Sequence, residues 1–195
     1  MIARGCAANG AHTILIDVNE QGLCETVEEL QRIISDSKYS SLETHAIHGD
    51  LSSEDGVKEI VAKVKALQNP VDALIHCAGV RPASVHNHQF VPSYQTSKAA
   101  VDHLVRIMAT EFADFYIRVN AISPGIVPSG MTTADASSNL HLAKEAPAGR
   151  AGNDEDMVGT ALWLMSKAGS FMDGKVVRVE GGRLLILKGV TSNSD

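Results

Sequence analysis

Apolar residues recur along the chain with two different spacings, and the two spacings alternate. Short runs rich in β-branched residues, with apolar neighbours on both sides, are typical of strands that are covered on two faces. Runs with apolar residues three and four positions apart are typical of amphipathic helices. The first spacing predicts strands at 12–18, 42–48, 71–77, 117–122 and 175–179. The second predicts helices at 20–35, 53–67, 94–112 and from 154 onward.

Local signals predict where several of these elements end. Residues 1–9 are typical of the back half of a helix, and Gly10 is expected to adopt the left-handed conformation that ends it. Ser52 and Asn153 are expected to cap the helices that follow them. The stretch 127–148 has clusters of Gly, Pro, Ser and Thr, which predicts a long loop that is either functional or mobile.

Strands and helices that alternate through most of the chain predict an α/β fold with a doubly wound parallel sheet. The sequence has 195 residues, of which 44% are hydrophobic, and such a length buries about 70% of its unfolded surface in one core. We therefore predict a single domain over 1–190 and a disordered tail at 191–195. Ligands bind these sheets beyond the carboxyl ends of the strands.

Charge and composition narrow the classes of partner. A net charge of −6 and a pI of about 5.7 leave no basic stripe for a row of phosphates, so nucleic acid is not an expected partner. No apolar run reaches the ~18 residues of a membrane span, and residues 1–15 lack the pattern of a secretion signal, so a cytoplasmic protein without membrane contact is expected.

Cysteine and histidine positions do not indicate a metal site. The three cysteines are odd in number and form no CxxC, which disfavours both a disulfide framework and a structural zinc site. The histidines His76, His86 and His88 are more typical of a polar loop than of a metal-binding cluster.

The helix predicted at 94–112 begins with Tyr94 and Lys98, which are one turn apart. Residues at this spacing share a helix face, and an ammonium near a phenol favours the phenolate, which an isolated phenol hardly forms at neutral pH. The pair therefore suits acid–base chemistry, although a Tyr and a Lys at this spacing also occur on ordinary helix surfaces. The apolar residues of this helix predict its buried stripe: Val101, Leu104, Val105, Met108 and Phe112.

Four motifs in a fixed order carry a resemblance to a known family. They are Tyr94-x-x-x-Lys98 followed by two alanines, the tetrapeptide 76–79 (HCAG), residues 118–125 (RVNAISPG), and the glycine pair 181–182. With them the chain resembles the short-chain dehydrogenase/reductase family over residues 1–189. Within the family, residues 1–11 (MIARGCAANGA) and 124–131 (PGIVPSGM) are similar to 3-oxoacyl carrier-protein reductase-like members. The resemblance implies a Rossmann-like sheet and an NAD(P)-dependent oxidoreductase that interconverts a carbonyl and a secondary alcohol on a small or acyl-chain substrate.

The resemblance also implies roles for individual residues. Tyr94 would exchange a proton with the substrate oxygen, and Lys98 would bind the nicotinamide ribose and lower the pKa of Tyr94. Asp17 would accept hydrogen bonds from the adenosine ribose, and because a carboxylate repels a 2′-phosphate, NAD is favoured over NADP. The other cofactor contacts would come from the ends of later strands: Asp50 and Leu51 beside the adenine, Ala78 and Gly79 at close backbone approach, and Pro124, Gly125 and Val127 beside the nicotinamide.

Two pieces of the family pattern are not found in this sequence. The family opens with a strand and a glycine-rich turn for the pyrophosphate, whereas this chain begins inside the helix that should follow them. Between Gly79 and Tyr94 the family has a helix and a strand that deliver an asparagine and a serine to the site, but only fourteen residues stand here. Ser84 and Ser93 have the wrong spacing to replace that serine. We therefore expect an incomplete sheet and a chain with weak activity or none. The missing pieces could result from skipped exons of a functional reductase, or the chain could be a natural truncated relative.

Two other functions stay open at this point. A non-catalytic Rossmann-like remnant could act as a binding or oligomerisation partner, since the Tyr-bearing helix takes part in the family's dimer interface, and a homo-oligomer is one expected assembly. A hydrolase that uses Ser93 or Ser97 with a histidine is disfavoured, because the sequence has no GxSxG elbow.

Overall fold

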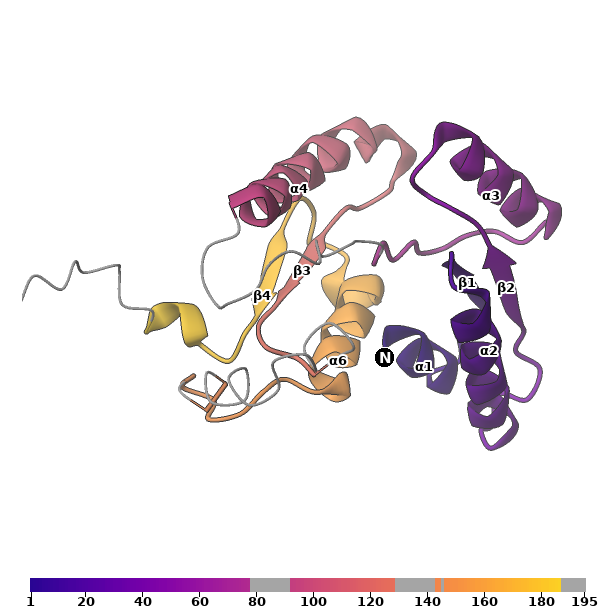
Figure 1. Ribbon diagram of the computed structural model, residues 1–195, viewed down its shortest axis with the longest axis horizontal. Helices are drawn as coiled ribbons and strands as arrows, with labels where there is room; N and C mark the ends of the chain where they lie inside the picture. Colours follow the sequence, from indigo (N-terminus) through magenta and orange to yellow (C-terminus); the bar gives the residue numbers. More distant parts are fainter. Residues whose placement is uncertain (78–91, 129–142, 145, 187–195) are drawn as a thin grey trace, which may run out of the picture. The chain divides into compact units, whose positions relative to one another are not determined.

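The computed structural model describes residues 1–77, 92–128, 143–144 and 146–186 (Figure 1). The chain divides into two compact units, Met1–Val80 and Arg81–Asp195, which we call unit 1 and unit 2. Each is described by itself. A single domain over 1–190 stays a prediction, and the predicted tail at 191–195 lies outside the described residues.

Unit 1 alternates helices and strands in the predicted order. Its two strands pair in parallel, with Thr13 opposite Thr44 and Asp17 opposite His48, so both strands end at the same edge. This confirms the first two predicted strands and the helices around them. The elements are α1 (Ile2–Ala8), β1 (Thr13–Asp17), α2 (Glu20–Ser35), β2 (Thr44–His48) and α3 (Glu54–Ala66).

The core of unit 1 lies between its first two helices and β1. Ala7 of α1 and Leu30 of α2 are fully buried, and Ile34 and Leu15 pack with them. Leu15 is paired with Ala46, so these two side chains lie on one face of the strand pair. Ile47, the next residue of β2, points to the other face and is also buried. The pair is therefore covered on both faces, as its β-branched composition predicts.

Of the two predicted ends of unit 1 helices, one is confirmed and the other is wrong by one residue. Gly10 follows α1 with φ +94°, the left-handed conformation expected there. The predicted cap of α3 is wrong by one residue, because the side chain of Ser53, rather than Ser52, accepts the hydrogen bond from Gly56 N at 3.1 Å. Ser52 is engaged by Asp50 instead.

The predicted strand at 71–77 is wrong. These residues form no ladder and are exposed, with Leu74 82% accessible. A strand needs a neighbour to bond its amides and carbonyls, and no segment of this sequence is predicted to supply the strand that would stand between 71–77 and β1 in the sheet. Within the described part of unit 1, β1 and 71–77 do not close up to pair with each other.

Unit 2 contains the second parallel pair, in which Ala121 lies opposite Val176 and Pro124 opposite Val179. Its main elements are α4 (Pro92–Glu111), β3 (Ala121–Pro124), α6 (Asp154–Met165) and β4 (Val176–Val179). Short 3-10 helices lie between them: η1 (Ala113–Phe115), η3 (Lys167–Gly169) and η4 (Arg183–Leu185). The two sheets of the described chain are thus both parallel and both short.

β3 begins four residues later than predicted, because residues 118–120 are bonded elsewhere. The guanidinium of Arg118 donates to the carbonyls of Leu164, Gly169 and Met172, at 2.7, 2.8 and 3.1 Å. Asn120 bonds Met172 O and Lys175 N through its side-chain amide. These contacts replace a strand ladder and fasten the start of β3 to the segment between α6 and β4.

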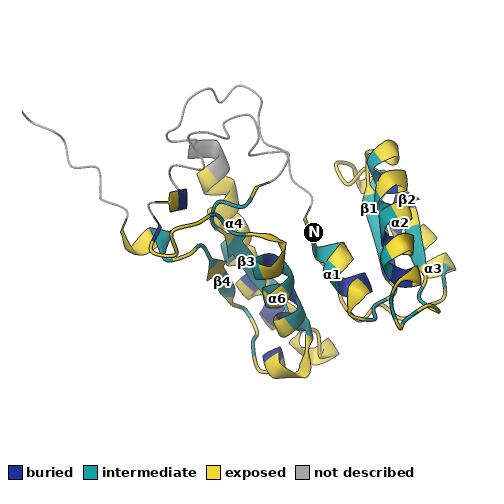
Figure 2. Cartoon of the chain, turned by 90° about the horizontal axis from the view of Figure 1, so that it is seen from below, coloured by how far each residue is buried: buried dark blue, intermediate teal, exposed yellow. Residues whose placement is uncertain are grey.

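The helices of unit 2 bury narrower faces than predicted (Figure 2). In α4, Val105 and Ala109 are buried, but Val101 and Leu104 of the predicted stripe are exposed. Ala109 lies against Gly174, just before β4, which fixes the buried side of the helix. In α6 the buried residues are Met157, Ala161 and Leu164, whereas Leu162 and Met165 are half-buried.

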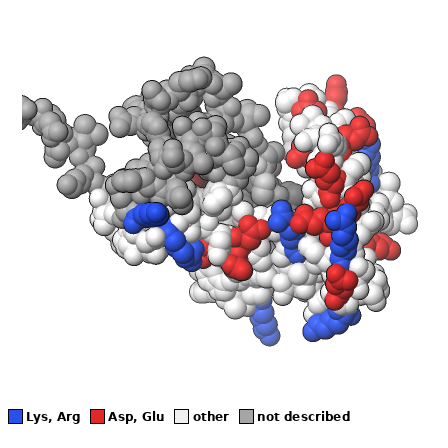
Figure 3. All heavy atoms as spheres, turned by 60° about the horizontal axis from the view of Figure 1, so that its bottom comes forward, with Lys and Arg blue, Asp and Glu red and all other residues white. Residues whose placement is uncertain are grey.

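Acidic and basic side chains are interspersed on the face shown in Figure 3. Several form ion pairs along helices, such as Lys58 with Glu54 and Lys63 with Glu59, both at 2.7 Å. Exposed pairs of this kind add little stability. They place each of these basic side chains beside an acidic one. None of the described helices combines the length and the apolar character that a membrane crossing requires.

Candidate functional site

The carboxyl end of β1 carries the first candidate residue, Asp17. Its Oδ1 accepts a hydrogen bond from Asn19 N at 2.9 Å, and Asn19 in turn caps α2 by accepting from Gly22 N at 3.1 Å. The turn that follows β1 therefore sets the carboxylate in place, while the residue stays exposed. The second carboxylate oxygen keeps its capacity to accept from a ligand hydroxyl.

The carboxyl end of β2 presents Asp50 and Leu51 at the same edge of the sheet. Asp50 accepts from Ser52 N at 2.8 Å and from Ser52 Oγ at 2.9 Å, and these two bonds lower the pKa of the Asp50 carboxyl. Leu51 and Val18 are 43% and 64% exposed, although apolar. Two acids and two exposed apolar side chains at one edge suit a ligand with a flat ring and a sugar.

Tyr94 and Lys98 lie in the first two turns of α4, which confirms the helix on which the pair depends. Lys98 is exposed. The side chain of Tyr94, like that of Ser93, lies outside the described part of the structure. The roles of both residues therefore stay predictions that rest on their spacing.

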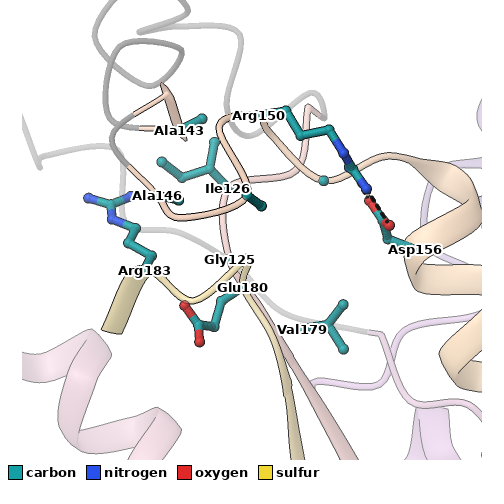
Figure 4. Close-up of a pocket in the computed structure, with 12 residues that line it drawn as sticks. Gly125, Ile126, Ala143, Ala146, Arg150, Asp156, Val179, Glu180 and Arg183 are labelled. Atoms are coloured by element: carbon teal, nitrogen blue, oxygen red, sulfur yellow. Dashed lines mark hydrogen bonds and ion pairs between the residues drawn. The ribbon is translucent and has the colours of Figure 1, made fainter. Parts of the chain in front are cut away.

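A small pocket of about 70 Å³ opens at the carboxyl ends of β3 and β4 (Figure 4). Three segments form it: the end of β3, residues 143–144 with 146–152, and the turn after β4. Backbone hydrogen bonds tie them together: Gly125 N to Val179 O, Gly152 N to Ile126 O, and Ala148 N to Gly181 O, at 2.8 to 3.0 Å. Gly125 of the predicted nicotinamide loop lines this pocket.

Glycines allow the three segments to approach so closely. A Cβ on Gly125 would lie 2.7 Å from the Cα of Glu180, and one on Gly181 would lie 2.9 Å from the Cβ of Ala148. Gly181 also has a φ of +66°, which side chains rarely adopt. The glycine pair at 181–182 is thus required by the close packing of these segments and by its left-handed backbone.

An ion pair holds the far wall of the pocket. Arg150 contacts both carboxylate oxygens of Asp156, at 2.6 and 2.9 Å, and Asp156 also accepts from Asn153 N at 2.8 Å (Figure 4). The side-chain oxygen of Asn153 in turn accepts a hydrogen bond from Asp156 N, which completes a capping box on α6 and confirms the predicted cap. The guanidinium, followed by the Asn153 amide, lowers the pKa of Asp156 to about 2.

The structure brings the predicted residues together in two groups, one in each unit. Asp17, Asp50 and Leu51 share one sheet edge in unit 1. In unit 2, Pro124 ends β3, and Gly125 and Val127 follow it. Ala78 and Gly79 lie outside the described residues, as do His86 and His88. Among residues 1–77, 92–128, 143–144 and 146–186, no three His, Cys, Asp or Glu side chains gather in a way that could hold a metal ion.

Sequence reasoning missed Arg150 as part of the pocket wall, and it missed Arg118 as the clamp that joins the start of β3 to the end of α6 and the segment after it. The partner of Arg150 is six residues away, and those of Arg118 are 46 to 54 residues away. No helical or strand periodicity links residues at such distances. The only available signal is that Arg118 opens the RVNAISPG motif.

Comparison with known proteins decides the family. Residues 83–183, more than half of the chain, match the family model described as enoyl-(acyl carrier protein) reductase, and residues 1–91 match the one described as short chain dehydrogenase. The chain belongs to the short-chain dehydrogenase/reductase family. The two matches overlap at residues 83–91, which lie outside the described part of the structure.

Two relatives show how much of the family's length is present. Short-chain dehydrogenase/reductase PhomF of Diaporthe leptostromiformis is 43% identical over 100 residues, which are 48% of this chain and 34% of that protein. The chain thus spans about a third of the length of that curated relative. Gluconate 5-dehydrogenase of Gluconobacter oxydans is 26% identical over 237 positions, covering 93% of this chain and 88% of the relative. That alignment has more positions than this chain has residues, so the relative carries extra residues within the matched region.

A solved structure confirms the fold class. The Pseudomonas aeruginosa RhlG/NADP active-site complex is similar with a TM-score of 0.81 and 25% identity, over 93% of this chain and 90% of that one. The predicted Rossmann-like α/β fold, with a sheet that is incomplete in its described part, is therefore confirmed. The exposed 71–77 segment marks one place where a strand of that sheet is not formed.

Proposed function

We propose that this chain functions as an NAD(P)-dependent oxidoreductase that interconverts a carbonyl and a secondary alcohol. The observation that carries the proposal is the position of Tyr94 and Lys98, one turn apart at the start of α4, in a chain of this family. A relative named for gluconate 5-dehydrogenase activity supports the reaction class, because carbon 5 of gluconate carries a secondary alcohol.

Each residue of the pair has a distinct task in the proposal. The Tyr94 hydroxyl gives a proton to the substrate oxygen in reduction and takes it back in oxidation. The Lys98 ammonium, on the same helix face, favours the phenolate that the second direction needs. A bound nicotinamide supplies or accepts the hydride. Pro124, Gly125 and Val127 are proposed to line the side of the site at which this ring is held.

The residues of unit 1 fit the adenosine half of such a cofactor. The exposed Asp17 carboxylate has an oxygen available for ribose hydroxyls, and Val18 and Leu51 offer apolar surface for a flat base. Asp50 fits less directly, since Ser52 already bonds both of its oxygens. We propose that Asp50 mainly shapes this turn and that Leu51 contacts the base.

We also propose a preference for NAD over NADP. The three residues after Asp17 are Val, Asn and Glu. Together with Asp17 they offer a 2′-phosphate two carboxylates and no cation. The RhlG complex contains NADP and does not support this preference, which rests on Asp17 and its turn alone.

Nucleotide binding tests the proposal. In a thermal-shift assay, NADH is expected to raise the melting temperature of the chain in a saturable way. NADPH should need at least ~10-fold higher concentration for the same rise, because the Asp17 carboxylate repels its 2′-phosphate. Asp17→Asn should narrow that difference, whereas Asp36→Asn, an equal charge change at the C-cap of α2, should leave it unchanged. Equal shifts with both nucleotides would contradict the preference for NAD but not the proposal that the chain binds a nicotinamide nucleotide.

Turnover tests the role of Tyr94. With gluconate and NAD⁺ as probes, absorbance at 340 nm reports reduction of the nicotinamide, and Tyr94→Phe should slow it by ~10² or more. Tyr39→Phe is the matched control, because Tyr39 lies in unit 1 between α2 and β2. An unchanged rate in Tyr94→Phe would rule out the proposed acid–base role.

A non-catalytic remnant that binds or oligomerises with a partner is the second candidate. The observation that favours it is the exposed, unpaired segment 71–77 at the position of a predicted sheet strand. The extra residues that gluconate 5-dehydrogenase carries within its alignment support a missing internal piece. Absence of any thermal shift with NADH and with NADPH, in protein that melts cooperatively, would favour this second function.

A further inference from the structure

A histidine stands beside Asp17 at the carboxyl end of the strand pair in unit 1 (Figure 1). Asp17 of β1 and His48 of β2 are partners in the parallel register, so their side chains lie on the same face of the pair. Both residues are exposed. None of the roles given above to Asp17, Asp50 and Leu51 involves this histidine.

The imidazole of His48 reaches across to the turn that follows β1. Its Nε2 lies 3.1 Å from the carbonyl oxygen of Val18, a residue 30 positions earlier in the chain. A carbonyl oxygen can only accept, so Nε2 carries the hydrogen of this bond. Val18 follows the last paired residue of β1, so the strand ladder does not determine where its carbonyl points. The imidazole supplies that constraint from the neighbouring strand.

One rigid peptide unit connects this bond to Asp17. The carbonyl of Val18 and the N–H of Asn19 belong to the same planar peptide. The N–H donates to Asp17 Oδ1 at 2.9 Å, while His48 holds the carbonyl at the other end. Rotation of this peptide would break both bonds together. A hydrogen bond to the carbonyl also polarises the amide and strengthens the bond that its N–H donates.

The backbone that carries His48 is held by two other elements. Gly49 N donates to Asp17 O at 3.1 Å, which extends the contact with β1 past His48. Lys63 of α3 donates from Nζ to His48 O at 3.2 Å. A Cβ on Gly49 would collide with the side chain of Ile60, so glycine allows α3 to pack closely at this point. The imidazole therefore projects from a backbone that β1 and α3 both hold in place.

We propose that His48 is a positioning residue of the nucleotide site, which orients the Asp17 carboxylate toward the adenosine ribose through the peptide between Val18 and Asn19. The inference rests on the proposed function, in which Asp17 accepts hydrogen bonds from the ribose hydroxyls. With Oδ1 engaged by Asn19 N, the other carboxylate oxygen is the one presented to the ligand. His48 acts in this role without contacting the ligand.

NADH affinity tests the proposal. Thermal shift over a range of NADH concentrations gives an apparent Kd for the parent chain and for each variant. His48→Leu has a side chain that cannot donate, and it should weaken NADH binding ~5-fold. His48→Gln can donate from its own Nε2 and should keep the affinity within ~2-fold of the parent. His48→Ala replaces His48→Leu if the latter does not fold.

His45→Leu is the matched control for these variants. It removes an imidazole from the same strand, but one that contacts Glu43 instead of the turn after β1. It should leave the affinity for NADH unchanged. An equal loss of affinity in His48→Leu and His45→Leu, or in His48→Leu and His48→Gln, would contradict the proposal, as would a His48→Leu chain that binds NADH like the parent.

A double variant shows whether His48 acts through Asp17. Asp17→Ala removes the carboxylate that His48 is proposed to orient. His48→Leu should then add no further loss, so the double variant should bind NADH as weakly as Asp17→Ala alone. Losses that multiply in the double variant would show that His48 acts independently of Asp17 and would overturn the proposal.

Hydrogen exchange at Asn19 separates this proposal from the proposed function. The Asn19 amide bonds Asp17 Oδ1 without any ligand, so NMR of the isotope-labelled chain reports on it directly. His48→Leu should speed this exchange at least ~3-fold, and His48→Gln should restore the parent rate. Unchanged exchange in His48→Leu would contradict the role of His48 alone. A parent chain that shows no thermal shift with NADH would contradict the proposed function instead.

Discussion

The two groups of candidate residues, one in each unit and here called half-sites, are built in different ways. In unit 1, Asp17 and Asp50 are each held by a residue two positions further along, Asn19 and Ser52. In unit 2, the pocket at the end of β3 depends on contacts between segments that are more than 20 residues apart in sequence, such as Gly125 with Val179. The first half-site is therefore a set of local turns on a small strand pair. The second exists only when three distant segments meet.

This difference bears on how each half-site responds to damage. A local turn keeps its shape as long as its own strand is formed, whereas a pocket made of distant segments is lost when any of them moves. Two probes separate the responses. Trp163, the single tryptophan of the sequence, reports on unit 2, and the buried thiol of Cys6 reports on unit 1 when the exposed Cys24 and Cys77 are changed to serine.

The largest effect is expected from Leu30→Ala in the core of unit 1. Leu30 is fully buried, and replacing a buried leucine by alanine costs about 3 to 4 kcal/mol through lost contacts and the cavity left behind. Urea unfolding should then expose Cys6 to labelling at lower urea. If the transition of Trp163 fluorescence shifts by the same amount, the two units unfold together and the single-domain prediction for 1–190 is supported. A shift confined to Cys6 would sharpen the division into two units.

The converse change is Arg118→Ala in unit 2. It removes three hydrogen bonds to carbonyls from a half-buried guanidinium, at a cost of about 2 to 3 kcal/mol. The Trp163 transition should move to lower urea, because Leu164 and the segment after α6 lose their clamp. Lys167→Ala, an exposed cation in the same segment, is the control and should cost less than ~0.5 kcal/mol. Equal effects of the two variants would show that the clamp adds no stability.

A pair of glycine substitutions tests the close approach in the pocket. Gly125→Ala should cost about 1 to 2 kcal/mol, because the new Cβ meets the Glu180 backbone at 2.7 Å. Gly159→Ala, inside α6 with open space around its Cβ position, should instead stabilise unit 2 by ~0.5 to 1 kcal/mol. The Trp163 transition measures both. Stabilisation by both would mean that the segments of the pocket do not meet as closely as described.

The smallest effect is expected from the ion pair at Asp156, and it depends on pH. The pKa of Asp156 falls from an ordinary ~3.9 to about 2 on folding, so its contribution is present above about pH 4 and is lost as the pH falls toward 2. Arg150 is more than half exposed, so solvent screening keeps this contribution to stability small. Asp156→Asn keeps a capping oxygen and should lower the stability measured by Trp163 at pH 7 but not near pH 2.

Asp55→Asn in the first turn of α3 is the control for that experiment. It removes a carboxylate that is also in the first turn of its helix, one position closer to the N-cap, but has no arginine partner among the described residues. Its stability difference from the parent chain should be smaller at pH 7. A larger difference for Asp55→Asn would assign the pH dependence to the helix dipole instead of to Arg150.

Local patterns of the sequence determined most of the elements of this protein. The helix at Glu20–Ser35, the strands that end at Asp17 and His48, and the cap at Asn153 follow from periodicity and from residues within four positions. Spacing also placed Tyr94 and Lys98 on one helix. These features depend on backbone hydrogen bonds and side chains that are close in sequence, so neighbouring residues suffice to specify them.

Only the tertiary structure decided which strands pair and what surrounds the pocket. The run at 71–77 is as apolar as the other strands, yet it forms none, because a strand is stabilised by a neighbour and no described strand stands beside it. The start of β3, the buried side of α4 and the Arg118 clamp depend on residues 46 or more positions away. Such contacts carry no periodic signal, and their formation depends on which segments of the chain are present to meet.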